Sequence, residues 1–467
     1  MLFSSITFLY YFLPIVLIIY YIAPLKGKNL VLLISSLIFY GWGEPRYIVL
    51  MVLTIAVQYL LGLLIERHLD TELAKLWMII SVCFSLGLLG YFKYSDFFIA
   101  NFNAATGLSM PLLRIALPVG ISFYTFQILS YTIDVYRKQT KAQKSIIDLA
   151  TYIVLFPQLV AGPIVRYTDV AAALENRAHS MEKFSYGLRR FVFGLSKKVL
   201  IANSLGELCN IFINAQDRSV LFSWMYALAF SLQIYFDFSG YSDMAIGLGH
   251  LFGFDFMENF NYPYISTSIT EFWRRWHMSL STWFRDYLYI PLGGNRVGKG
   301  RWLFNIMIVW LLTGFWHGAA WNFILWGLLF AIILIIEKLW INTLLRKIPK
   351  WLSHIYVLFI ILISFVIFDA PDISTAIVRI ASMFGVFNNK MIDVQSLYYL
   401  RSYGFILVLA IIGCTPLPRK LIGRLRKNRI CKAIADVMEP IAYTILLLVV
   451  TAYLVDSSFN PFLYFRF

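Results

Sequence analysis

Residues 302–336 read WLFNIMIVWLLTGFWHGAAWNFILWGLLFAIILII, without a single Asp, Glu, Lys or Arg. A helix that crosses a bilayer needs about 20 apolar residues, so this stretch is too long for one upright span and short for two. Gly314 and Gly318 stand near its centre, where glycine is able to break a helix. Arg301 precedes the stretch and Lys338 follows it. We therefore expect a helical hairpin that turns within the membrane.

His317 lies beside this central interruption. A helix from Trp302 to Trp316 is roughly 22 Å long, against a hydrocarbon core of about 30 Å, so we expect His317 to lie deep in the membrane. Such a histidine normally faces a protein interior or a wet cavity. A neutral imidazole, with an unperturbed pKa of about 6.5, accepts a proton from a hydroxyl near neutral pH. His317 is thus the main catalytic candidate, and a hydrogen bond between helices is the structural alternative.

The composition is that of an integral membrane protein. Of the 467 residues, 60% are hydrophobic and 14% are charged, whereas about 25% are charged in soluble domains. Together with shorter runs, the apolar stretches predict about ten to twelve membrane-inserted segments. The main stretches are 2–23, 77–91, 150–165, 225–249, 302–336, 356–368 and 441–454. No linker or repeat divides the chain, so we expect one membrane domain over 1–467, with its core signature at 225–330.

The formal net charge of +15 does not indicate a nucleic-acid partner, because the basic residues lie between apolar stretches. Clusters at 137–144, 338–350 and 419–432 predict cytoplasmic loops. Counting spans from these loops places the amino terminus and residues 457–467 outside. The first basic residue is Lys26, so we expect the first apolar stretch to be a retained helix in contact with membrane lipids.

The segment 257–301 carries too many charges to span, so we expect it to lie in the interface or to re-enter. A helix starting at Trp273, at about 100° per residue, places His277 within an apolar arc. The other members of that arc are Trp276, Leu280, Trp283, Phe284, Tyr287 and Leu288. Arg275 and Asp286 fall on the opposite side, and Arg274 and Arg285 form the edge. An interfacial helix is the alternative, but it does not explain why a histidine faces the packed side.

Pro and Gly interrupt apolar segments at 117–120, 156–163 and 261–263, and we expect these breaks to line an interior. Asp237 and Asp243 lie in another apolar segment, where acids are rare and usually paired. They could bind a substrate amine, relay protons or hydrogen-bond helix ends broken near Gly240.

Several catalytic motifs are missing from the chain. There is no Gly-x-Ser-x-Gly elbow, P-loop or dinucleotide fingerprint, so we expect no serine acyl-enzyme of its own. The four cysteines lack metal-type spacing, so we expect no metal site and no bound cofactor. They are Cys83, Cys209, Cys414 and Cys431.

Two motifs resemble the membrane-bound O-acyltransferase (MBOAT) family. They are WRRWHMSLSTWFRDYLYIPLGG at 273–294 and TGFWHG at 313–318. Further blocks are similar to the bacterial alginate O-acetylation branch of this family. These blocks are 1–5, 117–127, 130–137, 156–164, 237–247 and 460–467.

The resemblance implies an all-α polytopic protein of the bacterial plasma membrane, with re-entrant and interfacial helices in a ring of tilted helices around a tunnel. It maps the catalytic histidine onto His317 and a second, less strictly essential histidine onto His277. It further implies that an acetyl group passes from a cytoplasmic thioester, acetyl-CoA, to an extracytoplasmic partner similar to SGNH hydrolases, which esterifies a polysaccharide. A thioester donor of this kind is too polar to cross lipid, so the tunnel would pass only the acyl group.

The remaining site residues fall into two groups. Trp316, Asn322, Asp237 and Asp243 are candidates for lining the tunnel or binding substrate. Arginines before the hairpin are candidates for attracting the anionic donor at its entrance, with lipid-headgroup anchoring as the alternative. These are Arg274, Arg275, Arg285, Arg296 and Arg301.

Two other functions remain open at this level. A D-alanyl transferase that modifies teichoic acids from a carrier protein would need a carboxylate for the ammonium group, which Asp237 or Asp243 could supply. A polysaccharide exporter or flippase would also be polytopic and interrupted, but internal repeats would favour it and none is found.

Overall fold

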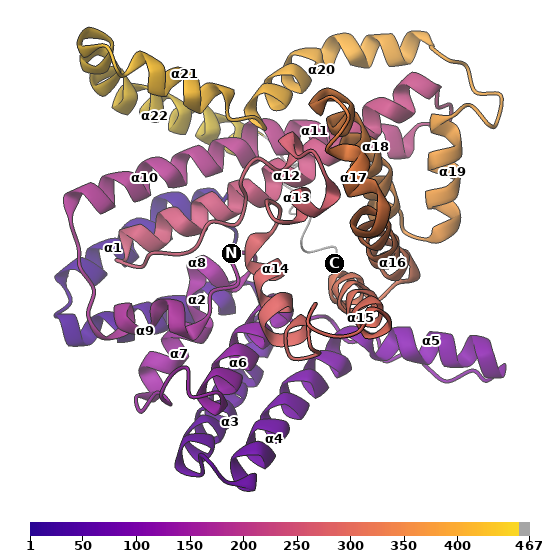
Figure 1. Ribbon diagram of the computed structural model, residues 1–467. Coiled ribbons are helices and arrows are strands. Elements are labelled where there is room, and N and C mark those ends of the chain that lie inside the picture. Colours follow the sequence, from indigo (N-terminus) through magenta and orange to yellow (C-terminus); the bar gives the residue numbers. More distant parts are fainter. Residues whose placement is uncertain (457–467) are drawn as a thin grey trace. The chain divides into compact units, whose positions relative to one another are not determined.

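The computed structural model describes residues 1–456, and within that range the chain forms helices and no strand (Figure 1). Seven of its helical stretches are long and apolar enough to cross a membrane. They are Pro45–Arg67, Glu72–Thr106, Val220–Leu251, Trp321–Leu345, Lys350–Asp369, Val394–Gly413 and Arg429–Asp456. The chain is therefore an all-α polytopic membrane protein, as expected. The tunnel and the number of inserted segments stay predictions.

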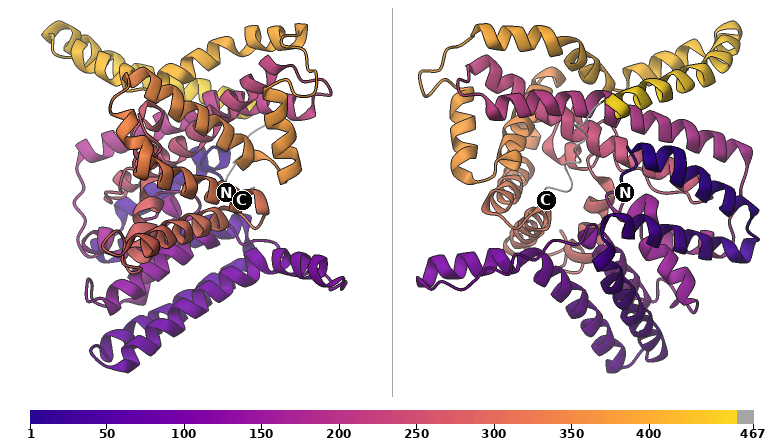
Figure 2. Two further views of the ribbon diagram at one scale, coloured as in Figure 1. Left: turned by 45° about the vertical axis from the view of Figure 1, so that its right-hand side comes forward. Right: turned by 180° about the vertical axis from the view of Figure 1, so that it is seen from behind.

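The first of two compact units comprises Met1–Phe191 and Ser242–Met257. Within it α3, α4 and α6 pack against one another, and Figure 2 shows α3 and α4 side by side. Its elements are η1 (Phe8–Phe12), α1 (Leu13–Ile22), η2 (Leu25–Gly27), α2 (Lys28–Gly43), η3 (Pro45–Tyr47), α3 (Ile48–Arg67), α4 (Glu72–Leu89), η4 (Gly90–Tyr94), α5 (Ser95–Thr106), α6 (Ile121–Tyr136), α7 (Ile146–Val154), α8 (Phe156–Leu159), α9 (Tyr167–Glu175) and most of α10 (Met181–Ser196).

The predicted interruptions in this unit are confirmed. The chain is irregular before α6 and again on both sides of the four-residue α8. Gly120 has a φ of +77°, and a Cβ there would lie 2.7 Å from the Leu159 carbonyl oxygen. Residues 149–165 are buried throughout, so this apolar stretch forms core rather than a lipid-facing span.

The second unit comprises Val192–Tyr241 and Glu258–Phe467, of which residues to 456 are described. Its elements are η5 (Lys197–Ala202), α11 (Asn203–Asn214), most of α12 (Val220–Leu251), η6 (Pro263–Ile265), α13 (Ile269–Trp273), α14 (Met278–Phe284), η7 (Arg285–Tyr289), α15 (Lys299–His317), α16 (Trp321–Ile336), η8 (Glu337–Ile341), α17 (Asn342–Leu345), α18 (Lys350–Asp369), α19 (Ile373–Met383), α20 (Val394–Gly413), α21 (Leu417–Leu425) and α22 (Arg429–Asp456).

A helix broken near Gly240, one of the three explanations considered for the two acids, is not found, because α12 runs without interruption from Val220 to Leu251. A Cβ on Gly240 would lie 2.7 Å from the Gly194 carbonyl oxygen and 3.2 Å from the Lys198 amide nitrogen. Gly240 therefore permits close packing of two backbone segments within the second unit and does not interrupt the helix.

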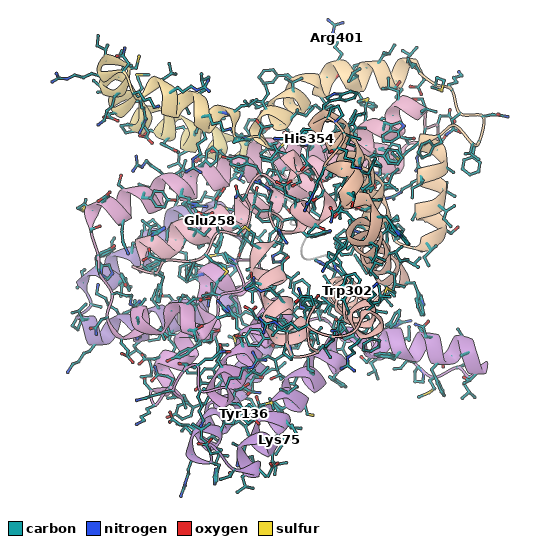
Figure 3. All side chains as sticks on the ribbon, in the orientation of Figure 1. Lys75, Tyr136, Glu258, Trp302, His354 and Arg401 are labelled. Atoms are coloured by element: carbon teal, nitrogen blue, oxygen red, sulfur yellow. The ribbon has the colours of Figure 1, made fainter. Side chains whose placement is uncertain are left out.

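The predicted helical hairpin is confirmed. Helices α15 and α16 pack along each other and are joined at Gly318–Ala320 (Figure 1), and Trp302 lies on the first turn of α15 (Figure 3). Gly314 does not break α15. A Cβ at this position would lie 2.2 Å from the Phe323 carbonyl oxygen and 3.2 Å from the Gly327 Cα, so the glycine brings the two helices together.

We expect Gly314→Ala to destabilise the protein by about 1–3 kcal/mol, because the added methyl group meets a backbone atom of α16 and forces the hairpin open. Thermal unfolding of the purified protein in detergent measures the effect. Gly300→Ala is the matched control on the same helix, since nothing lies within 4 Å of a Cβ there. An equal loss of stability in both variants would contradict the packing role of Gly314.

Two of the expected cytoplasmic loops are largely helical. The cluster 338–350 includes part of η8 and all of α17, and the cluster 419–432 includes most of α21 and the beginning of α22. Their location on the cytoplasmic side stays a prediction, as does a single membrane domain. The tail 457–467, with its block at 460–467, lies outside the described residues.

Candidate active site

His317 is the last residue of α15, at the end of the hairpin's first helix. Its side chain is partly exposed and sits among aromatic rings from three helices. Ring centroids lie at 5.1 Å for Trp316, 5.4 Å for Trp326 of α16 and 5.3 Å for Phe368 of α18, the last two nearly perpendicular at 85° and 81°. The imidazole is thus held by edge-to-face packing while part of it stays accessible. Its depth in the membrane stays a prediction.

His277 does not lie within a helix. It joins α13 to α14 with a φ of +44°, a left-handed conformation that is uncommon outside glycine. Two backbone hydrogen bonds hold this turn, from Met278 N to the Asn259 oxygen and from Asn261 N to the Arg275 oxygen, both 2.9 Å. The predicted continuous helix from Trp273 is therefore wrong. The hydrogen bonds to the segment 259–261 replace those that the helix loses at this turn.

The predicted inward face of this segment is nevertheless confirmed. Trp276, His277, Leu280, Trp283, Phe284 and Tyr287 are buried. Arg274 and Arg285, predicted at the edge, are exposed, whereas Arg275 and Asp286 of the predicted opposite side are only partly exposed. The two short helices keep the apolar arc on the protein side, and His277 is only 2% exposed.

The two histidines belong to one site. Trp316 lies between them, with its ring centroid 6.3 Å from that of His277 and 5.1 Å from that of His317. Burial, and to a lesser extent the nearby His317, lower the pKa of His277 well below its ordinary value. His277 is therefore uncharged at neutral pH.

Asn322 and Trp316 are both buried, and their predicted role in lining a tunnel or binding substrate stays a prediction. Asn322 donates from Nδ2 to the Ala370 carbonyl oxygen at 2.8 Å and so ties the start of α16 to the end of α18, beside Phe368. Its buried Oδ1 has no hydrogen-bond partner within residues 1–456. That oxygen is a hydrogen-bond acceptor available to a ligand.

The two intramembrane acids are held in salt bridges. Lys198 Nζ lies 2.6 Å from Asp237 Oδ1, with both side chains about 4% exposed or less. Asp243 pairs with Arg190 at 2.8 Å in the first unit. These pairs favour the structural explanation for both acids.

The arginines proposed for the donor entrance differ in their contacts. Arg275 pairs with Glu271 at 2.8 Å and Arg285 with Asp286 at 2.7 Å, so adjacent carboxylates already offset their charges. Arg274, Arg296 and Arg301 are exposed. Of the set, these three retain the best access for an anion, and the donor-entrance role stays a prediction.

The sequence did not single out Asn259 and Ser279, which hydrogen-bond to each other and to His277. Ser279 lies two residues after the histidine in the 273–294 motif, which was a usable signal, but nothing local marked Asn259. In the part of the chain that the structure describes, no three His, Cys, Asp or Glu side chains gather as metal ligands.

The two sequence motifs and the residues of this site lie within a region that matches a known protein family. The model of the MBOAT, membrane-bound O-acyltransferase family matches residues 135–368, and the chain belongs to that family. It is therefore an enzyme, a membrane-bound O-acyltransferase, which argues against the exporter alternative.

Three relatives show the range of similarity. The "Probable alginate O-acetylase AlgI" of Azotobacter vinelandii is 43% identical over 389 residues, 82% of this chain and 78% of the relative. The "Peptidoglycan O-acetyltransferase" of Helicobacter pylori is 35% identical over 423 residues, 83% and 80% of the two chains. The "Teichoic acid D-alanyltransferase" of Bacillus subtilis is 31% identical over 229 residues, 46% and 58%.

Proposed function

We propose that this enzyme takes an acetyl group from a cytoplasmic thioester, acetyl-CoA, and passes it across the membrane for O-acetylation of an extracytoplasmic polysaccharide. An SGNH-hydrolase-like partner protein on the outer side completes the transfer. The observation that carries the proposal is the position of His317, a partly exposed imidazole at the end of a helix, within an otherwise aromatic site.

His317 acts as the general base. It takes the proton of an acceptor hydroxyl as the oxygen attacks the thioester carbonyl carbon. The ester C–O bond forms, the C–S bond breaks, and the thiol leaves with a proton. The surrounding rings of Trp326 and Phe368 limit water at the reacting carbonyl, which favours transfer over hydrolysis.

The choice of acetyl donor and polysaccharide acceptor is supported by the relatives. Two O-acetylating relatives align with more than four fifths of this chain, whereas the D-alanyltransferase aligns with 46% of it. A D-alanyl group also carries an ammonium that needs a carboxylate. Asp237 and Asp243 are both occupied by basic partners, which favours acetyl over D-alanyl transfer.

A reconstituted assay tests the proposal. The purified protein in liposomes is supplied on one side with acetyl-CoA or with a D-alanyl carrier protein, and thiol release and acyl transfer are measured. We expect turnover with acetyl-CoA as the donor and none with the D-alanyl carrier protein. Turnover that requires the D-alanyl carrier would refute the acetyl donor, and no transfer of either group would refute the acyltransferase pathway as proposed.

The direction of transfer leads to a topological prediction. Lys299 begins α15 and is exposed, on the side that the basic clusters assign to the cytoplasm. We expect a cysteine at Lys299→Cys, in a background with Cys83 and Cys431 replaced by serine, to react with a membrane-impermeant thiol reagent only in inverted vesicles. Labelling in intact cells would overturn both the topology and donor entry from this side.

A further inference from the structure

The side chain of Asn259 makes an unusual set of contacts beside His277. Its Oδ1 lies 3.2 Å from the Ser279 backbone nitrogen and 2.9 Å from Ser279 Oγ, both of which donate to it. A backbone N–H is always a donor, so the Asn259 atom that faces it must be the carbonyl oxygen and not the amide nitrogen. The orientation of the Asn259 amide is thereby fixed.

The same oxygen lies 3.2 Å from His277 Nδ1. An amide oxygen only accepts, so Nδ1 must supply the hydrogen of this bond. Ser279 Oγ lies 3.5 Å from Nδ1. Because its hydroxyl donates to Asn259 Oδ1, it presents a lone pair to the ring. Asn259 Oδ1 and Ser279 Oγ therefore both present acceptors to Nδ1.

We infer that Asn259 is a positioning residue that fixes His277 as its Nδ1–H tautomer and so leaves Nε2 as a proton acceptor in the active site. The inference rests on the proposed function and deepens it. Asn259 touches neither donor nor acceptor in this account. It acts through His277, whose two ring nitrogens would otherwise exchange roles.

Two aromatic rings of the described residues also pack against the imidazole. Phe238 of α12 meets the imidazole at 4.6 Å and 90°, and Trp316 of α15 lies farther off at 6.3 Å. His317 is the titratable group whose charge acts on His277, and it disfavours a second positive charge there. The ring is therefore neutral, and the hydrogen bonds to Asn259 and Ser279 decide its tautomer.

Two substitutions at one position separate this role from simple packing. Asn259→Leu keeps the approximate volume and removes the acceptor, and we expect turnover to fall on the order of tenfold to a hundredfold, as when other orienting partners of functional histidines are lost. Asn259→Asp keeps an acceptor for both Nδ1 and Ser279. Its carboxylate also favours the imidazolium form, which raises the pKa of His277.

The expected pH dependence follows from this increase in the pKa of His277. His277 must be unprotonated at Nε2, so a higher pKa moves the acid limb of the pH–rate profile of Asn259→Asp upward by about one pH unit. Turnover above that limb stays close to wild type. Asn261→Leu is the matched control, because this exposed asparagine lies on the same segment and its backbone hydrogen bonds are unaffected.

A second measurement does not depend on activity. Nitrogen-15 NMR of imidazole-labelled protein, with His277→Gln to assign its signals, should show a protonated Nδ1 and an unprotonated Nε2 for His277, and tautomer averaging in Asn259→Leu. An Nε2–H signal in the wild type would refute the inference, as would an unshifted profile in Asn259→Asp or a folded Asn259→Asp as inactive as Asn259→Leu. Absence of wild-type acetyl transfer would instead refute the proposed function.

Discussion

Turnover of acetyl-CoA by His317→Ala is expected to fall by about a hundredfold or more, the usual loss when a general base is removed. The imidazole packs against Trp316, Trp326 and Phe368, so its removal leaves a small cavity between these rings and removes the proposed base. The loss should appear in kcat with little change in the KM for the donor, because the base acts in the transition state. Steady-state kinetics of the reconstituted protein measure both.

His68→Ala is a matched control, since His68 directly follows α3 and its ring nitrogen Nδ1 lies 2.9 Å from the Leu64 carbonyl oxygen of that helix. It should retain full turnover. Equal size-exclusion profiles and melting temperatures for the wild type and His317→Ala would show that the variant is folded. A folded His317→Ala protein with more than about a tenth of wild-type turnover would contradict the assignment of His317 as the base.

The largest expected loss of stability is that of Asp237→Ala. This change leaves the ammonium of Lys198 buried at 3% exposure without its carboxylate, and breaking a buried pair in this way costs about 3–5 kcal/mol. Thermal unfolding in detergent measures the loss. The surface pair of Lys183 and Asp255 provides the comparison, because its side chains are 37% and 62% exposed and Lys183→Ala should cost about 1 kcal/mol or less.

A double variant distinguishes an unpaired charge from a lost contact. Lys198→Met with Asp237→Leu removes both charges and keeps apolar volume in a site that is already buried. Such replacements are often neutral. We therefore expect the double variant to unfold near the wild-type temperature, and a double variant less stable than Asp237→Ala would contradict the explanation.

The hairpin and the position of His317 were predictable because they depend on features close together in sequence. The stretch is uncharged and too long for one span, and the histidine directly precedes the interruption at Gly318. The inward face of 273–288 was also predictable, because side-chain periodicity survives a local break. The role of each glycine was not predictable from the sequence. Backbone atoms of other helices lie too close to Gly314 and Gly240 to leave room for a side chain.

The conformation of His277 could not be inferred for a similar reason. Its left-handed backbone is held by hydrogen bonds to Asn259 and from Asn261, which lie more than a dozen residues away in sequence. The basic partners of Asp237 and Asp243 could not be predicted either, since Arg190 and Asp243, for example, are 53 residues apart in the sequence. Helical periodicity reports neighbours within a few residues and carries no information about such pairs.

The contact between His317 and Phe368 has a consequence for how the enzyme is made. The hairpin supplies Trp316, His317 and Trp326, so most of the ring packing is available once α16 has emerged from the ribosome. Phe368 is the penultimate residue of α18 and is synthesised about fifty residues after His317. A nascent chain that ends before α18 therefore lacks one of the aromatic rings that pack against His317, and the proposed reaction centre is complete only after α18 is made.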